Sequence, residues 1–320
     1  MLSLQSWCLM GALFGAAVLL KLYFNGPSCK ISKNLTGKVV IVTGSNCGIG
    51  FYTALRMAEL GASVIMATRD PSRAEPALAE IRRKVKSAQI EFIKLDLASL
   101  KSVREFVDTF KSKYNRLDIL INNAGLSMAE RTVTSDGFEM VFQVNYLGHF
   151  LLTHLLTDYL LKSAPSRIVN VSAIIQKHQR INWDDMMSTK NYNWTVPYGQ
   201  SKLAQVIYAN EFNKRYEQRG VKAVSLHPGV ANSEFQRNIF KKFWIKAIIF
   251  LTYPILLFFA KTTGKGAQTT IYCALEDHEK LSGGNYYADC KIRKLANPVA
   301  FDDETGKKLW DRTVELLNLK

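Results

Sequence analysis

Short apolar runs alternate with longer segments of mixed polarity along most of the chain. Runs rich in valine and isoleucine predict buried strands at Val39–Val42, Ser63–Ala67, Ile90–Lys94, Leu117–Ile121, Arg167–Ser172 and Val221–Leu226. Helical patterns cover Phe51–Ala58, Pro71–Lys86, Leu100–Tyr114, Gly137–Leu161, a segment that begins at Pro197, and Glu304–Leu317. This alternation predicts an α/β fold, a doubly wound parallel sheet with helices on both faces.

Two segments interrupt the alternation. Residues 174–196 are polar and aromatic, and residues 232–265 are strongly apolar. The apolar segment contains Lys246 and Pro254, so its uninterrupted stretches are shorter than the roughly 20 residues that a membrane span needs. We expect a helical lid over a binding site, in reach of a bilayer. A second membrane span and an ordinary buried core segment are the alternatives.

The N-terminal segment Met1–Phe24 is also apolar. No charged residue occurs from Trp7 to Leu20, and the segment reaches spanning length if Lys21 extends toward the lipid headgroups. A secretory signal peptide is the alternative, but no Lys or Arg precedes the run and no Ala-x-Ala site follows it. Basic residues follow the run instead, and this asymmetry predicts an uncleaved anchor with the rest of the chain in the cytosol.

The remainder of the chain is interpreted as one domain. The chain has 320 residues, 48% of them hydrophobic, which is enough for one large core. No linker rich in proline, glycine or serine divides it, and we find no internal repeat. We therefore expect a membrane anchor with a basic flank at residues 1–30 and a single domain at residues 31–320.

Charge and cysteine content exclude several classes of function. The formal net charge is +15, but the basic residues are dispersed and accompany no nucleic-acid-binding motif. An anionic membrane surface and a phosphorylated cofactor explain the excess better than nucleic acid does. The five cysteines are scattered, with neither Cys-x-x-Cys spacing nor histidine partners at metal spacing. This pattern favours a reducing compartment over a disulfide framework or a zinc site.

A glycine-rich turn, Thr43–Gly50, follows the first predicted strand and precedes the first predicted helix. Glycines in this context let the backbone turn tightly and approach a pyrophosphate, whose charge then lies at the N-terminus of the helix. Far downstream, Tyr198 and Lys202 lie four residues apart, on one face of a predicted helix. An ammonium near a phenol favours the phenolate, so we expect a lowered pKa for Tyr198 and proton transfer near neutral pH.

Together with Asp96-Leu97, Asn122–Gly125 and Pro228-Gly229, these motifs resemble the short-chain dehydrogenase/reductase family, from about Lys38 to the C-terminus. Within the family, Asn145–Thr153 and Gly266–Tyr272 look like the microsomal retinol dehydrogenases. The resemblance implies a Rossmann-type sheet and a nicotinamide cofactor. It assigns to the cofactor Gly44, Ser45, Asn46, Gly48, Ile49, Gly50, Asp96, Asn123, Ala124, Gly125, Pro228 and Gly229, with Tyr198 and Lys202.

The choice between NAD and NADP depends on the end of the second strand, Ala67–Asp70. An acidic side chain there binds the ribose 2′-hydroxyl of NAD, whereas arginine suits the 2′-phosphate of NADP. Asp70 lies about 20 residues after the glycine turn, so the spacing alone permits NAD. The family alignment puts Thr68 at the usual acidic position and Arg69 directly after it. We therefore expect NADP(H).

The resemblance also implies the catalytic groups. Tyr198 exchanges a proton with the substrate oxygen, Lys202 lowers the pKa of Tyr198 and holds the nicotinamide ribose, and Asn145 anchors a relay water. One position departs from the family: Ala173 stands where a serine usually hydrogen-bonds the substrate oxygen, twenty-five residues before the tyrosine. Ser172 precedes it and points to the opposite face by strand alternation, unless a bulge or an early strand end turns it toward the site.

These observations predict an NADP(H)-dependent oxidoreductase that interconverts a lipophilic alcohol and its aldehyde or ketone, with the retinol/retinal pair implied by the resemblance. We expect it on the endoplasmic reticulum membrane or a lipid droplet with its domain facing the cytosol, with no nucleic acid partner. A homodimer through the helices that bear Asn145 and Tyr198 is implied by the family. Because of Ala173, the alternative is a cofactor-binding pseudoenzyme that acts as a membrane or lipid-droplet interaction protein.

Overall fold

The structure is a computed structural model that describes residues 15, 19–21, 23–229 and 260–319. Most of the expected anchor, and most of the expected lid at residues 232–265, lies outside these residues. No helix within the described ranges is both long and apolar enough to cross a membrane.

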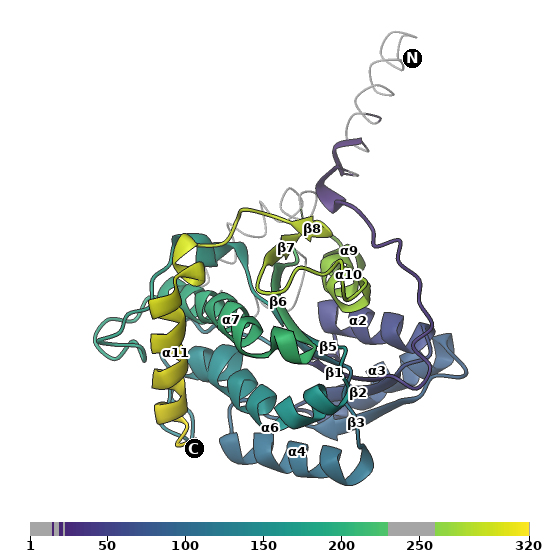
Figure 1. Ribbon diagram of the computed structural model, residues 1–320, viewed down its shortest axis with the longest axis horizontal. Helices are drawn as coiled ribbons and strands as arrows, with labels where there is room; N and C mark the ends of the chain where they lie inside the picture. The colour runs from purple at the N-terminus through teal and green to yellow at the C-terminus, as the bar shows by residue number, and fades with distance from the viewer. Residues whose placement is uncertain (1–14, 16–18, 22, 230–259, 320) are drawn as a thin grey trace, which may run out of the picture.

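An eight-stranded sheet forms the centre of the described structure (Figure 1). Its strands are β1 Val39–Thr43, β2 Ser63–Thr68, β3 Ile90–Lys94, β4 Ile119–Asn122, β5 Ser166–Val171, β6 Val221–His227, β7 Tyr286–Ala288 and β8 Lys291–Ile292. They lie in the order β3-β2-β1-β4-β5-β6-β7-β8, and only the pairing of β7 with β8 is antiparallel. The doubly wound parallel sheet is therefore confirmed, whereas the last two strands were not predicted because they span only three and two residues.

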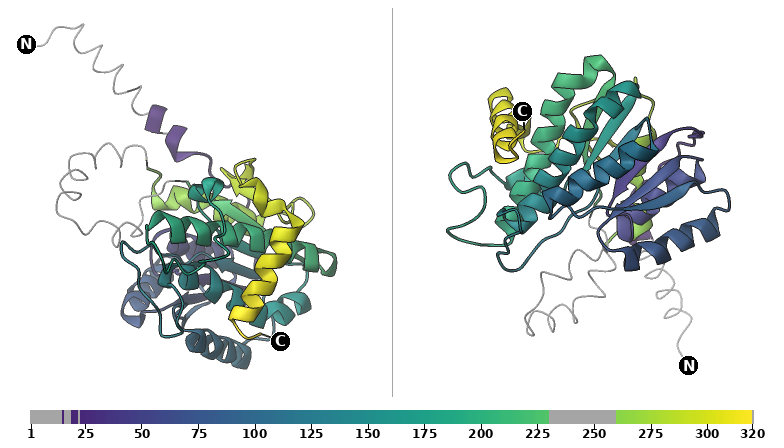
Figure 2. Two further views of the ribbon diagram at one scale, coloured as in Figure 1. Left: turned by 90° about the vertical axis from the view of Figure 1, so that its left-hand side faces the viewer. Right: turned by 90° about the horizontal axis from the view of Figure 1, so that it is seen from below.

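Helices cover both faces of the sheet (Figure 2). One face carries α2 Gly48–Glu59, α3 Pro71–Lys84 and α10 Gln268–Leu275; the other carries α4 Leu100–Lys113, α6 Gly148–Lys162 and α7 Thr195–Tyr216, with α11 Asp303–Leu316 packed on α7. Shorter helical segments are α5 Met140–Phe142, α9 Thr263–Gly266, and the 3₁₀ turns Ile174–His178, Glu217–Arg219 and Pro298–Phe301. Each face thus has its own apolar core.

The helix predicted over Gly137–Leu161 is not continuous. It begins at Met140, and a π-helical turn, Gln143–Leu147, separates α5 from α6. In this turn the N–H of Gly148 donates to the carbonyl of Gln143, five residues earlier. Every residue from Val141 to Thr153 is buried, so no alternation of buried and exposed positions marks the π turn in the sequence. π turns of this kind are frequent at functional sites.

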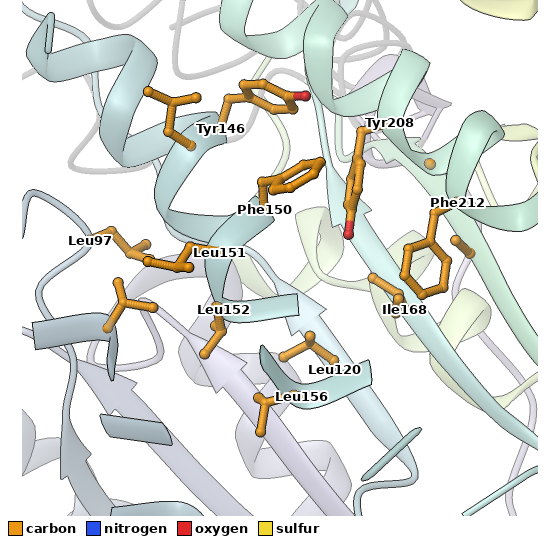
Figure 3. Packing of buried hydrophobic residues seen from close by; sticks show 14 of the residues in the cluster. Leu97, Leu120, Tyr146, Phe150, Leu151, Leu152, Leu156, Ile168, Tyr208 and Phe212 are labelled. Carbon is orange, nitrogen blue, oxygen red and sulfur yellow. The ribbon is translucent and has the colours of Figure 1, made fainter. Parts of the chain in front are cut away.

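Aromatic side chains join α6 to α7, where the ring of Phe150 lies beside that of Tyr208 (Figure 3), and α11 packs on both. The ring of Trp310 on α11 lies 5.1 Å from that of Phe150 and 5.8 Å from that of Tyr208, and the hydroxyls of Tyr146 and Thr313 are 2.9 Å apart. Burial of each large ring contributes roughly 1.5–3 kcal/mol. The chain's own α11 therefore covers part of the face on which a homodimer was expected, and the dimer stays a prediction.

The strand order reverses between β1 and β4, since the chain moves outward to β3 and then returns to the other side of β1. The loops that leave the carboxyl ends of β1 and β4 consequently run in opposite directions and open a crevice. In open α/β sheets this crevice is where ligands bind.

Candidate active site

A cavity of about 610 Å³ lies at this crevice. Most of the residues predicted from the sequence line it, and they come from the loops after β1, β2, β3, β4, β5 and β6 and from α7: Gly44, Asn46, Gly48, Ile49, Gly50, Arg69, Asp96, Asn123, Ala124, Gly125, Ser172, Tyr198, Lys202, Pro228 and Gly229. Ser45 and Asn145 do not line the cavity; both are fully buried behind its wall. The structure therefore brings the predicted residues together around one space, with these two in a supporting position.

The turn between β1 and α2 has the backbone geometry of a phosphate-binding loop. Gly44 and Gly48 have φ angles of +64° and +62°, which favour glycine over every other residue. A Cβ at Gly50 would lie 2.4 Å from the carbonyl oxygen of Gly44, so this position also requires glycine. The hydroxyl of Ser45 donates to the carbonyl of Val42 at 2.9 Å, which points it away from the cavity. The turn exposes backbone N–H groups at a helix N-terminus, and a pyrophosphate fits that chemistry.

Thr43 fastens this turn to the loop after β4. Its hydroxyl oxygen accepts from the backbone N–H groups of Asn123 and Ala124, both at 2.9 Å. The side-chain amide of Asn123 in turn donates to the carbonyl of Thr43 at 2.8 Å. The two loops that border the crevice are thus held as one unit.

The end of β2 presents cations to the cavity. Arg69 and Arg73 are exposed and line it, whereas the carboxylate of Asp70 caps α3 by accepting from the backbone N–H of Ser72 at 2.9 Å and from its hydroxyl at 2.7 Å. These hydrogen bonds, the hydroxyl first, hold the pKa of Asp70 below its usual value. Within the described residues Arg69 has no hydrogen bond or ion pair. Asp70, whose distance from the glycine turn permitted NAD, is therefore engaged as the cap of α3, while Arg69 lines the cavity.

Two further walls come from the loops after β3 and β6. The carboxylate of Asp96 accepts from the N–H of Ala98 at 3.0 Å and lies beside the cavity. His227, at the end of β6, also lines it, and burial lowers the pKa of this histidine to about 4. His227 is therefore neutral at physiological pH. It was not among the predicted residues.

Tyr198 and Lys202 lie on one face of α7 and both border the cavity, as predicted. The Nζ atom of Lys202 lies 5.9 Å from the centre of the Tyr198 ring and donates to the carbonyl of Val171 at 2.9 Å. Burial lowers the pKa of Lys202 to about 7. Burial, with a smaller contribution from Tyr286, raises the pKa of Tyr198. The lowered tyrosine pKa that we expected is therefore wrong for the protein alone, because desolvation outweighs a lysine engaged with the backbone.

Asn145 lies in the π turn, where both ends of its side chain are bound. Its oxygen accepts from the N–H of Leu126 at 2.8 Å, and its amide nitrogen donates to the carbonyl of Leu126 at 2.9 Å and to the hydroxyl of Ser201 at 3.0 Å. The side chain thus ties the π turn to the loop after β4 and to α7.

The backbone carbonyl of Asn145 lies 3.0 Å from Nδ1 of His149, whose Nε2 lies 2.9 Å from the hydroxyl of Thr43. A carbonyl can only accept, so Nδ1 carries the proton and Thr43 donates to Nε2. Burial lowers the pKa of His149 to about 3, which keeps the ring neutral. The π turn and the glycine turn are joined through this one imidazole.

Ser172 and Ala173 resolve the departure noted at the end of the fifth strand. The strand ends at Val171, one residue earlier than predicted, and the hydroxyl of Ser172 donates to the backbone carbonyl of Lys202 at 2.7 Å. Ala173 follows in an extended conformation and also lines the cavity. The hydroxyl of Ser172 therefore supports α7, and the side chain at the serine position of the family is a methyl group.

The segment 174–196 supplies an apolar wall near Tyr198, formed by Ile174, Ile175 and Trp194 with Leu126 from the loop after β4. Gln200, which is fully buried on α7, holds this segment: it accepts from the N–H of Asn182 at 2.8 Å and donates to the carbonyl of Met186 at 2.8 Å. The polar, aromatic interruption of the sequence is thus part of the site.

Sequence reasoning missed several residues that hold this site, notably Thr43, His149 and Gln205, whose side chain bonds to Lys202 Nζ and to the Asn145 carbonyl. A signal existed for two of them. His149 follows Asn145 by four residues and Gln205 follows Lys202 by three, and both spacings place residues on one helix face. For Thr43 the last position of a buried strand gave no indication of its contacts. Within the described residues, no group of three or more His, Cys, Asp or Glu side chains could hold a metal ion.

Comparisons with known proteins agree with this geometry. Residues 38–243 match the family model for short chain dehydrogenases. Retinol dehydrogenase 12 of Mus musculus is 41% identical over 312 residues, which cover 97% of this chain and 96% of that protein. Retinol dehydrogenase 13 of Homo sapiens is 41% identical over 315 residues, covering 97% and 94%. A crystal structure of an uncharacterized protein from Mycobacterium Paratuberculosis has 29% sequence identity and a TM-score of 0.73, covering 92% of this chain and 98% of that one.

Proposed function

The chain belongs to the short-chain dehydrogenase family, and we propose that it uses NADPH to reduce a lipophilic aldehyde, with retinal as the first candidate. Its family and its retinol dehydrogenase relatives make it an oxidoreductase that acts on CH–OH groups. The cofactor's phosphate, the substrate and the direction belong to the proposal. The observation that carries it is the position of Tyr198 and Lys202 on the same cavity as the glycine turn.

The cofactor would lie along the crevice. The backbone of the glycine turn would hold the pyrophosphate, Asp96 and Asn123–Gly125 would border the adenosine, and Pro228-Gly229 would border the nicotinamide end. Arg69 would pair with the 2′-phosphate, because Asp70 is committed to the cap of α3 and the guanidinium matches a phosphate in charge and shape. NADPH supplies the hydride in this reaction.

Tyr198 and Lys202 would carry out the proton transfer. Because burial raises the pKa of Tyr198, its hydroxyl keeps its proton near neutral pH and can donate it to the oxygen of a bound aldehyde. The tyrosinate that remains is favoured by the nearby ammonium of Lys202. A protonated Tyr198 is the form that the reduction of an aldehyde requires.

The substrate class follows from the wall beside Tyr198. Ile174, Ile175, Trp194 and Leu126 offer apolar contact next to the proton donor, as expected for a hydrocarbon chain or ring. Retinol dehydrogenase is the name of the relatives, which makes retinal the first aldehyde to test. A polyprenyl or fatty aldehyde is the nearest alternative.

Membrane attachment is the second part of the proposal. The division into an anchor at residues 1–30 and a domain at residues 31–320 is supported at Leu35, which is buried in the core and donates to the carbonyl of Leu60 at 2.7 Å. Leu19 and Tyr23 are 69% and 79% exposed, which suits lipid contact. Lys21 donates to the carbonyl of Ala260 at 2.8 Å, so the end of the anchor meets the end of the proposed lid. Both apolar segments would then face the same membrane, that of the endoplasmic reticulum or a lipid droplet.

Ala173 is the one observation that favours a second candidate, a cofactor-binding pseudoenzyme at a membrane. A missing oxygen-stabilising donor typically costs on the order of 10²–10³ in rate. Tyr198 and Lys202 are both in place, however, and the relatives bear the names of enzymes. We therefore favour a slow or specialised enzyme over a binding protein.

The test uses full-length protein in phospholipid vesicles. We expect it to consume NADPH with all-trans-retinal, and to do so far less with a short hydrophilic aldehyde of the same reactivity. NADPH binding is measured in parallel by fluorescence. Binding without turnover on any long-chain or isoprenoid aldehyde would contradict the proposal and support the pseudoenzyme.

Topology is tested in sealed microsomes. Protease added from outside should digest the domain, and the acceptor sequence at Asn193-Trp194-Thr195 should remain unglycosylated. Protection of the domain, or a glycan on Asn193, would place the domain in the lumen.

A further inference from the structure

Gln205 connects Lys202 with the backbone of Asn145. It lies one helical turn after Lys202 on α7 and is 2% exposed. Its side-chain oxygen accepts from Lys202 Nζ at 3.3 Å, and its side-chain nitrogen donates to the backbone carbonyl of Asn145 at 2.7 Å. Among the described residues, no other side chain hydrogen-bonds to Lys202 Nζ. The amide therefore spans the gap between α7 and the π turn.

The orientation of this amide has only one solution. An ammonium can only donate hydrogen bonds, and a backbone carbonyl can only accept them. The oxygen of Gln205 must consequently face Lys202, and its nitrogen must face Asn145. A side chain that presented only a donor or only an acceptor could not satisfy both partners.

The π turn provides the carbonyl that Gln205 binds. The backbone N–H of Gly148 reaches five residues back, to Gln143, and within this turn the Asn145 carbonyl accepts from two side chains, those of Gln205 and His149. Loss of Gln205 would leave one hydrogen bond fewer on a buried carbonyl and one fewer on a buried ammonium. Such groups are costly to leave unpaired.

We propose that Gln205 is a positioning residue that holds the Lys202 ammonium toward the cavity and takes the place at Asn145 that the family resemblance gives to a relay water. This inference rests on the proposed function, since it gives Lys202 its task. A primary amide does not exchange protons with an ammonium near neutral pH. The link through Gln205 therefore orients Lys202 and favours its charged form, and protons reach Tyr198 from the cavity side.

Within the described residues, the titratable side chains that interact with Lys202 are those of Tyr198, on the same helix, and His149, on α6. Burial lowers the pKa of His149 to about 3 and raises that of Tyr198, so both are uncharged near neutral pH. Burial lowers the pKa of Lys202 itself to about 7. A hydrogen bond from the ammonium to Gln205 opposes that shift, and its removal should lower the pKa further.

The first experiment follows the titration of Lys202 in the full-length free protein by NMR with ¹³Cε-labelled lysine, assigned with Lys202→Met. We expect Gln205→Met, which keeps the length and removes the dipole, to lower the midpoint by about one pH unit. Gln205→Glu should raise it, because a carboxylate favours the ammonium. Gln200→Met is the matched control: an equally buried glutamine on the same helix whose side-chain hydrogen bonds go to Asn182 and Met186.

A purely structural role would destabilise Gln205→Met and Gln200→Met alike and leave the Lys202 midpoint in place. A folded Gln205→Met protein with the wild-type midpoint would therefore overturn the proposal. If Gln205→Glu fails to fold, Gln205→Met and its control still decide the question.

Kinetics separate this proposal from the proposed function. With NADPH and all-trans-retinal, the alkaline limb of kcat/KM should move to lower pH in Gln205→Met by the same amount as the NMR midpoint. If the wild type reduces no aldehyde and the NMR midpoint still shifts, the enzyme assignment fails and the positioning role stands. If the wild type is active and neither quantity shifts, only the positioning role fails.

Discussion

The two ends of the cavity are built by different means. At the end near β1 and β2, the binding groups are backbone N–H groups in a glycine turn and the exposed side chains of Arg69 and Arg73. At the end near α7, Lys202 borders the cavity, and Asn145 and Gln205 form a side-chain network behind it: Asn145 is fully buried, Gln205 is 2% exposed and Lys202 is 4% exposed. One end relies on the shape of the main chain, and the other on a side-chain network.

This difference has consequences for substitutions. A charge at the exposed end is screened by water and salt, so removing it weakens one contact and little else. A group at the buried end has lost its hydration and depends on its partners, so removing it alters their pKa values and positions too. Changes near α7 should therefore be larger and more strongly coupled than changes near β2.

The largest effect is expected for Tyr198→Phe. The substitution removes the proton donor and keeps the ring, so kcat/KM with all-trans-retinal should fall by about 10²–10⁴. The dissociation constant for NADPH, measured by fluorescence, should rise by no more than about tenfold, because at most one hydrogen bond from the hydroxyl to the cofactor is lost. An active Tyr198→Phe protein would mean that another group donates the proton.

Arg69→Ala tests the exposed end. A charge-assisted contact to phosphate contributes roughly 1.5–3 kcal/mol, so NADPH affinity should fall about tenfold to over a hundredfold while NADH affinity stays nearly constant. Arg83→Ala, an exposed arginine in the last turn of α3, is the matched control. A wild type that prefers NADH, or a mutant with unchanged NADPH affinity, would refute the role of Arg69.

Lys202→Met tests the buried end through stability. The folded-state pKa of Lys202 is about 7, below its unfolded value near 10.4, so the unfolded chain binds more protons between these values and the lysine's destabilising effect disappears as pH rises. Relative to Lys202→Met, the wild type should therefore gain up to about 1.4 kcal/mol in the free energy of unfolding per pH unit from about 7 to 10. Urea unfolding at several pH values measures this. Parallel curves for the two proteins would show that the lysine is not desolvated.

The smallest expected change is a gain in Ala173→Ser. Ala173 lines the cavity at the serine position of the family, so a hydroxyl there should stabilise the substrate oxygen and raise kcat/KM by about threefold to tenfold, less than the full effect of an evolved donor. The rate is compared with that of Ser172→Ala, which removes a hydroxyl bound to the backbone of α7. A loss of activity in Ala173→Ser would show that the pocket is adapted to the methyl group.

The sequence predicted the exposed end better than the buried end. Glycines at fixed spacing after a strand predict a turn directly, because few other backbone conformations require glycine. Gly44, Gly48 and Gly50 form the expected turn. Arg69 was predicted from its position at the end of the second strand alone. At this end of the cavity, residues that are neighbours in the sequence form both the turn and the binding groups.

At the buried end, the contacts join residues that are distant in the sequence. The chain from Thr43 through His149 to the Asn145 carbonyl and on to Gln205 connects β1, α6, the π turn and α7. The hydrophobic pattern of the sequence does not indicate such a network, and it does not indicate the π turn. The expected pKa of Tyr198 was wrong for the same reason. The spacing in the sequence predicted that Tyr198 and Lys202 lie on one helix face, but it did not predict the burial that raises the pKa of Tyr198.

The central claim is that NADPH would supply a hydride to the carbonyl carbon of a lipophilic aldehyde while Tyr198 donates a proton to its oxygen. The most direct test incubates the full-length protein in vesicles with all-trans-retinal and NADPH that carries deuterium at the transferable position, and analyses the retinol by mass spectrometry. The account predicts one deuterium at the carbinol carbon with wild type, and labelled retinol formed at least about 10²-fold more slowly with Tyr198→Phe. Absence of labelled retinol with wild type, while NADPH binds, would contradict retinal as the substrate, and labelled product formed at the wild-type rate by Tyr198→Phe would contradict the role of the tyrosine.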